Sequence, residues 1–524
     1  MASTTAYATR SFGQFRPANL GLATIGLSLG TFMQVLDMSI ANVSLPTIAG
    51  DLAVSQDQST WVITSFTVAQ AITLPMTGFL SRRFGEVKVF VTCVLLFSLF
   101  SLCDGLATSL AMLVIFRILQ GAACGPMYPI TQSLMVQIYP REKMGVALAI
   151  ISMITVVAPI VGPVLGGYIT DSYSWRWIFL INVPIGIFSA ALVWSQLHER
   201  VEKLVREHID WIGAAALIIG IGSLQILLDK GQDLDWFASH VIVALGIIAA
   251  IALTVWVVWE LTEEQPLVDL RLFRRRNFAS GTLAMTLGYA LFFAIPLILP
   301  LWMQGTLGYT ALWAGLATAP FGVLPLLLTY WIGKYASKVD LRLAASFSFV
   351  VMGLVCFRFG QFNTGINFGS IAMAEFAIGL GVAFFFMPVL TIALSELEGP
   401  DIAEGSGSMT FMRTVGASFG ISIVTYLWDR GGAVSHANLA EVINPFNDQI
   451  RSKLAVSPSQ LQHYAAGINR MITEQGMQVS FNHLFDGLGV VFFLLILLVW
   501  FAKPPFISRG HSRQGSSADK PSNL

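Results

Sequence analysis

Fourteen stretches of the chain are long and apolar enough to cross a lipid bilayer, and this repeated pattern constrains the fold most. They cover residues 19–41, 59–80, 88–107, 110–135, 144–169, 176–197, 210–229, 239–261, 278–303, 312–334, 342–360, 369–391, 406–428 and 483–503. A spanning helix needs roughly 20 mostly apolar residues, because hydrocarbon offers backbone groups no water to bond. The sequence therefore predicts an all-α integral membrane protein with 14 transmembrane helices.

The composition excludes most soluble classes. Only 11% of the 524 residues are charged and 55% are hydrophobic, whereas soluble domains carry about 25% charged residues. The net charge of zero gives no basic excess for a nucleic-acid partner. Four cysteines lie in apolar stretches without a C-x-x-C pair, and seven histidines show no metal-ligand spacing. We expect no metal, no cofactor and no catalytic site.

Basic residues mark alternate connections between the spans. They lie at 82–88, 141–143, 200–206, 271–276 and 334–342 and in the tail, while the intervening short connections are nearly free of Lys and Arg. The positive-inside bias therefore places residues 1–18, residues 504–524 and both termini in the cytoplasm. Residues 429–482 form a long, polar, outward-facing connection that we expect to be partly helical.

An aspartate lies inside the first span, in the stretch FMQVLDMSIANVSLP. At 100° per residue, Gln34, Asp37, Ala41 and Ser44 fall within a stripe of about 80°. Charges in hydrocarbon are costly, so we expect this stripe to face a water-filled cavity rather than lipid. Arg117 of the fourth span lies at a similar depth, about 10 Å from the outer end of its helix. Similar depth allows these two charges to pair, directly or through water, only where the first and fourth spans lie side by side.

Four motifs carry a resemblance to a known family. They are LDMSIANVSLP (36–46), GFLSRRFGEVK (78–88), RILQG (117–121) and APIVGPVLGGYI (158–169). In this order and on these spans they resemble the signatures of the major facilitator superfamily, and specifically of its fourteen-spanning drug:proton antiporters. WRWIFLINVPIG (175–186), GSLQILLDKGQDLDWF (222–237), NPFN (444–447) and WFAKPPF (500–506) extend the resemblance to the EmrB type of multidrug exporter.

The resemblance implies a major facilitator fold, with six-helix bundles at 19–200 and 278–503 and two inserted helices within 201–277. It implies a proton-driven exporter of hydrophobic or amphipathic toxic compounds across the bacterial inner membrane, working by alternating access and giving multidrug resistance. A FarB-like fatty-acid exporter and a proton-coupled importer of a small solute remain alternatives. It also implies an EmrA-like periplasmic adaptor and a TolC-like outer-membrane channel as partners. The connection 429–482 is either part of a docking surface or simply solvated.

Three intramembrane charges besides the one at position 37 have more than one interpretation. The resemblance implies that the first and fourth spans line one cavity, so Asp37 and Arg117 are expected to pair there. Arg117 then either tunes a proton carrier, Asp37, or joins the first and fourth spans. Glu375 is a second protonation site or a counter-charge for cationic drugs, or else it pairs with Arg358. Arg413 either extends to the cytoplasmic interface or contacts anionic substrates.

A substrate cavity for bulky apolar ligands would be lined by adaptable aromatic and methionine side chains with a few polar groups. Plain helix packing is the alternative for each candidate. The candidates are Met33, Gln34, Gln120, Tyr128, Tyr289, Phe292, Phe385, Met387 and Arg413.

Two motifs are expected to govern conformational change. The loop motif contains Gly78, Arg82, Arg83 and Gly85 but reverses the usual family charges, so Arg82 is expected to pair with Glu86 if it pairs at all. The fifth-span motif contains Pro159, Gly162, Pro163, Gly166 and Gly167. Its prolines kink the helix and its glycines allow close helix approach. In the family this segment contacts the second bundle.

The energy source follows from an absent motif. The chain contains no G-x-x-x-x-G-K-[ST] nucleotide loop. The expected driving force is therefore an ion gradient or the substrate's own gradient. One elementary charge is worth roughly 2.3 kcal/mol per 100 mV.

Overall fold

The computed structural model describes residues 17–506, except 141–142, 201–203, 205–209, 232–233, 264–265, 267, 337, 398–400 and 443–457. These residues form helices joined by short turns, and no strand occurs among them. The first half comprises α1 (Leu20–Asp51), α2 (Gln56–Ser59), α3 (Trp61–Thr73), α4 (Thr77–Phe84), α5 (Glu86–Gly105), α6 (Leu110–Cys124), α7 (Met127–Ile138), α8 (Met144–Ser172), α9 (Trp177–Leu180) and α10 (Asn182–Leu197).

The remaining helices complete the chain. Two helices follow the first half, α11 (Trp211–Lys230) and α12 (His240–Thr262), with the short η2 (Trp236–Ala238) between them and η3 (Leu270–Arg274) after them. The second half comprises α13 (Arg276–Thr306), α14 (Ala311–Thr318), η4 (Ala319–Gly322), α15 (Val323–Tyr335), α16 (Leu341–Phe359), α17 (Phe368–Ala383), α18 (Phe386–Leu394), α19 (Asp401–Val442) and α21 (Pro458–Trp500).

Most of these helices are long and apolar enough to span a membrane. Eleven qualify within the described residues, and two bent pairs raise the number to 13. The predicted thirteenth span, α19, is not among them, because its sequence is rich in Gly, Ser and Thr. The prediction of an all-α, multi-pass membrane protein is confirmed.

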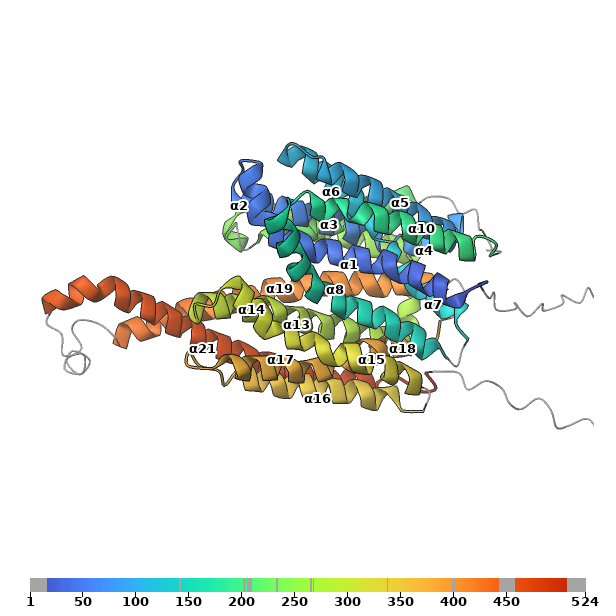
Figure 1. Cartoon of the computed structure of the whole chain (residues 1–524). Helices are drawn as coiled ribbons and strands as arrows, with labels where there is room; N and C mark the ends of the chain where they lie inside the picture. Colours follow the sequence, from blue (N-terminus) through green and yellow to red (C-terminus); the bar gives the residue numbers. More distant parts are fainter. Residues whose placement is uncertain are drawn as a thin grey trace, which may run out of the picture.

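Two groups of helices lie side by side (Figure 1). Helices α1 to α10 pack on one another, and α13 to α21 do the same. The contacts between the groups involve mainly α4, α7 and α8 on one side and α15, α18 and α19 on the other. Helix α11 contacts both α3 and α19, and α12 packs on α11. The start of α1 and the end of α21 lie at the same end of the molecule (Figure 1).

The polar connection expected at 429–482 is largely helical where it is described. α19 continues without a break to Val442, and the next helix already begins at Pro458. These two extensions project beyond the other helices as the pair of rods at the left of Figure 1.

Helix ends follow the local sequence. Several helices begin after a side chain that accepts a hydrogen bond from a backbone N–H of the first turn, which satisfies one of the unpaired donors there. These capping residues are Asn19, Ser109, Asp210, Thr310, Asp340 and Asn367.

The prolines within residues 278–334 affect their helices unequally. α13 runs unbroken through Pro296 and Pro300. Pro320, in contrast, lies in η4, the short turn that separates α14 from α15.

One glycine sets the distance between α6, the helix of Arg117, and α3. A side chain at Gly121 of α6 would place its Cβ 2.3 Å from the carbonyl oxygen of Phe66 in α3. This close approach requires glycine. It brings the α6 side chains within reach of the α3 backbone.

Candidate functional site

The expected charge pair is present deep inside the first half. Nη1 of Arg117, on α6, lies 2.6 Å from Oδ2 of Asp37, on α1. Asp37 is 2% exposed and Arg117 is fully buried. Salt and water screen such a buried pair only weakly. Removing either charge would therefore leave the other buried without compensation.

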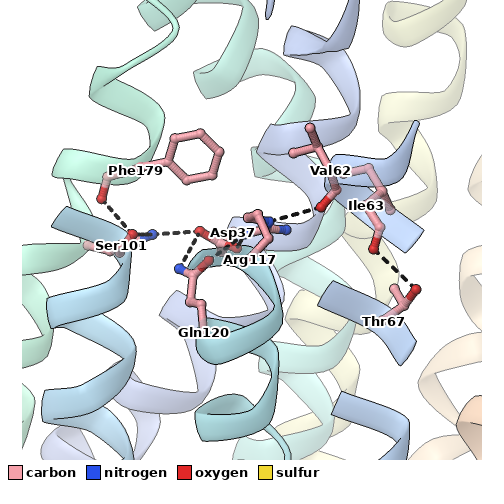
Figure 2. A network of polar contacts seen from close by, with 9 residues as sticks. Asp37, Val62, Ile63, Thr67, Ser101, Arg117, Gln120 and Phe179 are labelled. Carbon is pink, nitrogen blue, oxygen red and sulfur yellow. Dashed lines mark hydrogen bonds and ion pairs between the residues drawn. The ribbon is translucent and has the colours of Figure 1, made fainter. Parts of the chain in front are cut away.

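Polar side chains complete the shell around the carboxylate. Asn182, the first residue of α10, donates to Oδ1 of Asp37 at 2.7 Å, and Gln120 donates to the same oxygen at 3.4 Å. Asn182 also donates to Ser101 at 3.0 Å, and Ser101 donates to the Phe179 carbonyl at 2.8 Å. Figure 2 shows Asp37, Gln120, Ser101 and Phe179 of this network, which with Asn182 connects α1, α5, α6, α9 and α10.

The guanidinium of Arg117 is held by the backbone of α3 and by Gln120 of its own helix. Nε of Arg117 donates to the carbonyl of Val62 at 3.1 Å, and Nη1 also donates to Gln120 at 2.6 Å (Figure 2). The guanidinium carbon lies 4.1 Å from the centre of the Phe66 ring, within cation–π range. Nη2 has no hydrogen-bond partner among the described residues.

The polar stripe of the first span faces protein. Gln34, Asp37, Ala41 and Ser44 are all buried, and Ser44 hydrogen bonds to Thr170 of α8 at 2.8 Å. The expectation that the stripe avoids lipid is therefore correct. The expectation of an open, water-filled cavity at Asp37 is wrong for this conformation, because neighbouring helices close around the carboxylate.

Sequence reasoning missed several members of the network. Asn182 lies in a quoted motif but received no role, and Ser101 is an ordinary serine inside a span. Gln120 was assigned to the substrate cavity, whereas it bonds both members of the ion pair. Its position three residues after Arg117 on the same helix face was the available signal.

A second buried cation lies between the two halves. Arg413 of α19 donates to the hydroxyl of Tyr128, on α7, at 3.3 Å. Its guanidinium carbon lies 4.7 Å from the ring centres of both Tyr128 and Tyr289. Arg413 is only 7% exposed, so the interpretation that it extends to the cytoplasmic interface is wrong. Its Nε has no hydrogen-bond partner among the described residues.

Aromatic rings continue from this cation into the second half. Tyr289 packs against Phe293 at 4.4 Å and against Phe386 at 5.9 Å between ring centres, and Phe292 contacts Phe386 and Phe321. Tyr128, Tyr289, Phe292 and Arg413 therefore form one cluster. The other apolar candidates, Met33, Phe385 and Met387, are fully buried in the packed core.

Glu375 is isolated within the second half. It is 3% exposed, and its Oε1 has no hydrogen-bond partner among the described residues. Arg358, its expected alternative partner, lies over the ring of Phe362 at 5.4 Å. No ion pair between Glu375 and Arg358 is found in the described part of the chain.

An ion pair connects the two halves at the end that carries the basic connections. Arg82 of α4 pairs with Glu404 of α19. Glu404 also accepts a hydrogen bond from the backbone N–H of Asp269 at 2.6 Å and packs over Gly78. The expected pairing of Arg82 with Glu86 is wrong, because Glu86 instead accepts from Ser133 at 2.6 Å.

The rest of the loop motif shapes the turn between α4 and α5. Gly85 has φ +90°, a conformation that disfavours any side chain. Arg83 lies over the rings of Phe79 and Phe84, at 5.8 and 5.6 Å.

Reversing both charges of the Arg82–Glu404 pair is expected to preserve activity better than reversing one. Arg82→Glu should slow transport, because two carboxylates would then meet where the halves join. Arg82→Glu combined with Glu404→Arg restores opposite charges and should recover most of the rate. Initial transport rates of the three variants in membrane vesicles, normalised to protein amount, provide the measurement. A double variant as slow as the single one would contradict the pairing.

The fifth-span motif packs within the first half. Cβ atoms added at Gly162 and Gly166 would meet Ser39 and Ile40 of α1. Ser39 also donates to the carbonyl of Pro159 at 3.1 Å, and α8 bends by 43° between Pro159 and Val164. No atom lies within 4 Å of the position a Cβ would take at Gly167, and the side chain of Pro163 lies outside the described part.

The contact of α8 with the second half lies nearer its start. A Cβ added at Gly145 would lie 2.4 Å from the carbonyl oxygen of Gly333, on α15. Gly162 and Gly166 of the motif therefore face α1, whereas Gly145, near the start of α8, faces the second half.

Three known proteins place this geometry in context. The multidrug export protein EmrB of Escherichia coli K12 is 47% identical over 498 residues, 94% of this chain and 97% of EmrB. The fatty acid resistance protein FarB of Neisseria gonorrhoeae is 43% identical over 499 residues, 94% of this chain and 98% of FarB. The solved structure of the proton:xylose symporter XylE shares the fold, with TM-score 0.58, 14% identity and coverage of 92% and 95%.

The family assignment follows from these comparisons and the helical architecture. The model of the Major Facilitator Superfamily matches residues 27–421. That segment runs from the first span through Asp37, Arg117 and Arg413. The chain is a multi-pass membrane transporter, not an enzyme, and it belongs to the major facilitator superfamily.

Proposed function

We propose that the chain is a proton-driven antiporter that exports hydrophobic or amphipathic toxic compounds and so gives multidrug resistance. The observation that carries the proposal is the buried Asp37–Arg117 pair, in a chain 47% identical to a multidrug export protein. A buried carboxylate beside one cation can exist in two protonation states that differ in charge, which is what a proton-coupled step requires.

The coupling role of the pair follows from its electrostatics. With Asp37 ionised, the pair is neutral and tightly bonded at 2.6 Å. When Asp37 takes up a proton, Arg117 loses the attraction of this carboxylate inside a low-dielectric site, which favours a rearrangement of the surrounding helices. A proton moving down a potential of about 150 mV contributes roughly 3.5 kcal/mol, enough for a concentration ratio of about 300.

Glu375 is proposed as a second protonation site, in the other half of the molecule. It lies buried without an ionic partner, so its charged form would be costly in this conformation. With Asp37 in the first half and Glu375 in the second, each half of the transporter would contain a carboxyl that can take up a proton.

The transporter is proposed to lie in the bacterial inner membrane with both termini in the cytoplasm. The basic connections support this orientation. The helical extensions of α19 and α21 then face the periplasm. They offer a surface for an EmrA-like adaptor, which would pass substrates on to a TolC-like outer-membrane channel.

Everted membrane vesicles that contain the full-length chain test the function. Acidifying the vesicle lumen should drive accumulation of an amphipathic dye, and an uncoupler should release the dye. Vesicles from cells with an empty vector are the control. The proposal fails if the chain makes no difference to accumulation, or if accumulation persists without a proton gradient.

Fatty-acid export is the second candidate, favoured by the buried cation between the halves. Among the described residues, Arg413 contacts aromatic rings and one hydroxyl, so a carboxylate could pair with it. The similarity to FarB supports the same reading. A second arm of the vesicle assay, with a fluorescent long-chain fatty acid instead of a cationic dye, distinguishes the candidates. Accumulation of the fatty acid alone would favour this one.

A further inference from the structure

A third buried acidic side chain lies beside the Asp37–Arg117 pair. Asp104 is the penultimate residue of α5 and is fully buried. Neither of its carboxyl oxygens has a hydrogen-bond partner among the described residues. It lies three residues after Ser101, which belongs to the network around Asp37. The i, i+3 spacing puts Ser101 and Asp104 on the same helix face.

The charges around Asp104 come from two neighbouring helices and from the turn before α9. Arg117 on α6 and Asp37 on α1 both interact with it electrostatically. The other nearby cation is Arg176, whose backbone carbonyl faces Gly105. Its guanidinium is already bonded to Asp51, at 2.7 Å, and to the carbonyl of Ala107. Arg117 is therefore the cation that Asp104 can share.

The buried cluster contains two carboxyls, of Asp37 and Asp104, but only one guanidinium, of Arg117. With both acids ionised, the buried cluster would carry one excess negative charge, and the isolated carboxylate would cost several kcal/mol. One proton on either acid makes the cluster neutral. In this structure Arg117 bonds Asp37, and its Nη2 remains without a hydrogen-bond partner. This free nitrogen offers the guanidinium a way to bond a second acid.

Asp104 lies nearer the outer end of the first half than the pair does. It is one residue from the end of α5, and residues 106–109 connect that end to the start of α6. Arg117 is seven residues into α6, or about 10 Å along the helix. In the orientation expected from the basic connections, a proton from outside would reach Asp104 first.

We propose that Asp104 is the outer proton acceptor of the transport cycle and alternates with Asp37 as the partner of Arg117. The proposal rests on the proposed proton-driven function. In the state described here, Asp104 holds the proton and Asp37 pairs with Arg117. In the other state the O–H bond of Asp104 has broken, the proton is on Asp37, and Arg117 pairs with Asp104. The cluster holds one proton and no net charge in both states.

Infrared spectroscopy of the purified full-length protein tests the proton directly, without transport. The wild type should show a protonated-carboxyl band that Asp104→Asn removes and Asp104→Glu retains at a shifted frequency. Asp37→Asn should also remove this band, because Arg117 is then free to pair with an ionised Asp104. Asp51→Asn, which changes a half-exposed aspartate on the outer side, should leave the band unchanged. Because Asp104→Glu keeps a carboxyl at this position, a band in this variant would show that Asp104→Asn loses the band through the missing carboxyl and not through a folding defect.

Transport supplies the second readout. Asp104→Asn should shift the pH of half-maximal uptake by about one unit or more, equivalent to about tenfold in proton concentration. Asp104→Glu should recover most of the wild-type profile. A wild-type pH profile in Asp104→Asn, or an unchanged infrared band in that variant, overturns the proposal. If the wild type moves no substrate, the proposed function fails, while the infrared result still decides whether Asp104 holds a proton.

Discussion

Asp37→Asn is expected to reduce proton-driven accumulation of a dye to the level of vesicles without the chain. Asparagine keeps the shape of the side chain and its oxygen can still accept from Arg117, but it can neither carry a negative charge nor release a proton. The hydrogen bonds from Asn182 and Gln120 surround this one position, so the change acts at the centre of the network. Initial rates in everted vesicles, normalised to the amount of protein, provide the measurement.

The matched control for this change is Asp51→Asn. Asp51 is also an aspartate of α1 in an ion pair, with Arg176, but its side chain is 47% exposed. A pair this exposed is worth about 1 kcal/mol or less, so transport by this variant should stay close to wild type. Wild-type accumulation by Asp37→Asn would show that Asp37 only fastens its helix, and the coupling proposal would be lost.

Arg117→Met is expected to cause the largest loss of stability among single changes in the first half. It leaves Asp37 buried without its cation, which typically costs 3–5 kcal/mol, whereas the methionine still fills space against Phe66. The midpoint of thermal unfolding in detergent should therefore fall clearly. Arg358→Met, the same change at an exposed arginine, should have an effect within about 0.5 kcal/mol.

A variant that lacks both charges distinguishes the contribution of the ion pair to stability from the contribution of side-chain packing. The double variant Asp37→Asn/Arg117→Met contains no lone charge, so its unfolding midpoint should return most of the way to wild type. Its transport should remain absent, because the titratable group is gone. If the double variant is as unstable as the sum of the two single variants, the pair contributes no coupling energy.

The sequence predicted the class of fold and the central pair for physical reasons. Apolar stretches of spanning length leave a chain few alternatives to membrane helices. The family resemblance placed the first and fourth spans together, and the aspartate and arginine at similar depths in them were each the nearest candidate partner for the other. Helical periodicity then gave the buried face of α1 correctly, from Gln34 to Ser44.

The residues that were missed depend on tertiary contacts. Asp104 stands at the end of an apolar stretch, where a carboxyl normally faces water, and the packing of neighbouring helices such as α6, α9 and α10 on α5 buries it. Glu404 precedes its predicted span, so sequence depth gave no reason to set it beside Arg82. Arg413 was misplaced because a long side chain can reach the interface, but two tyrosines from separate helices hold it inside.

The unbroken length of α19 has a mechanical consequence. Its 42 residues extend for about 63 Å, roughly twice the thickness of the hydrocarbon core. Such a rod acts as a lever: a tilt of about 10° in the second half would sweep its tip by about 11 Å, given this length. A partner bound at the tip would be displaced in each transport cycle. A rigid partner that resists this displacement would slow transport from outside the membrane.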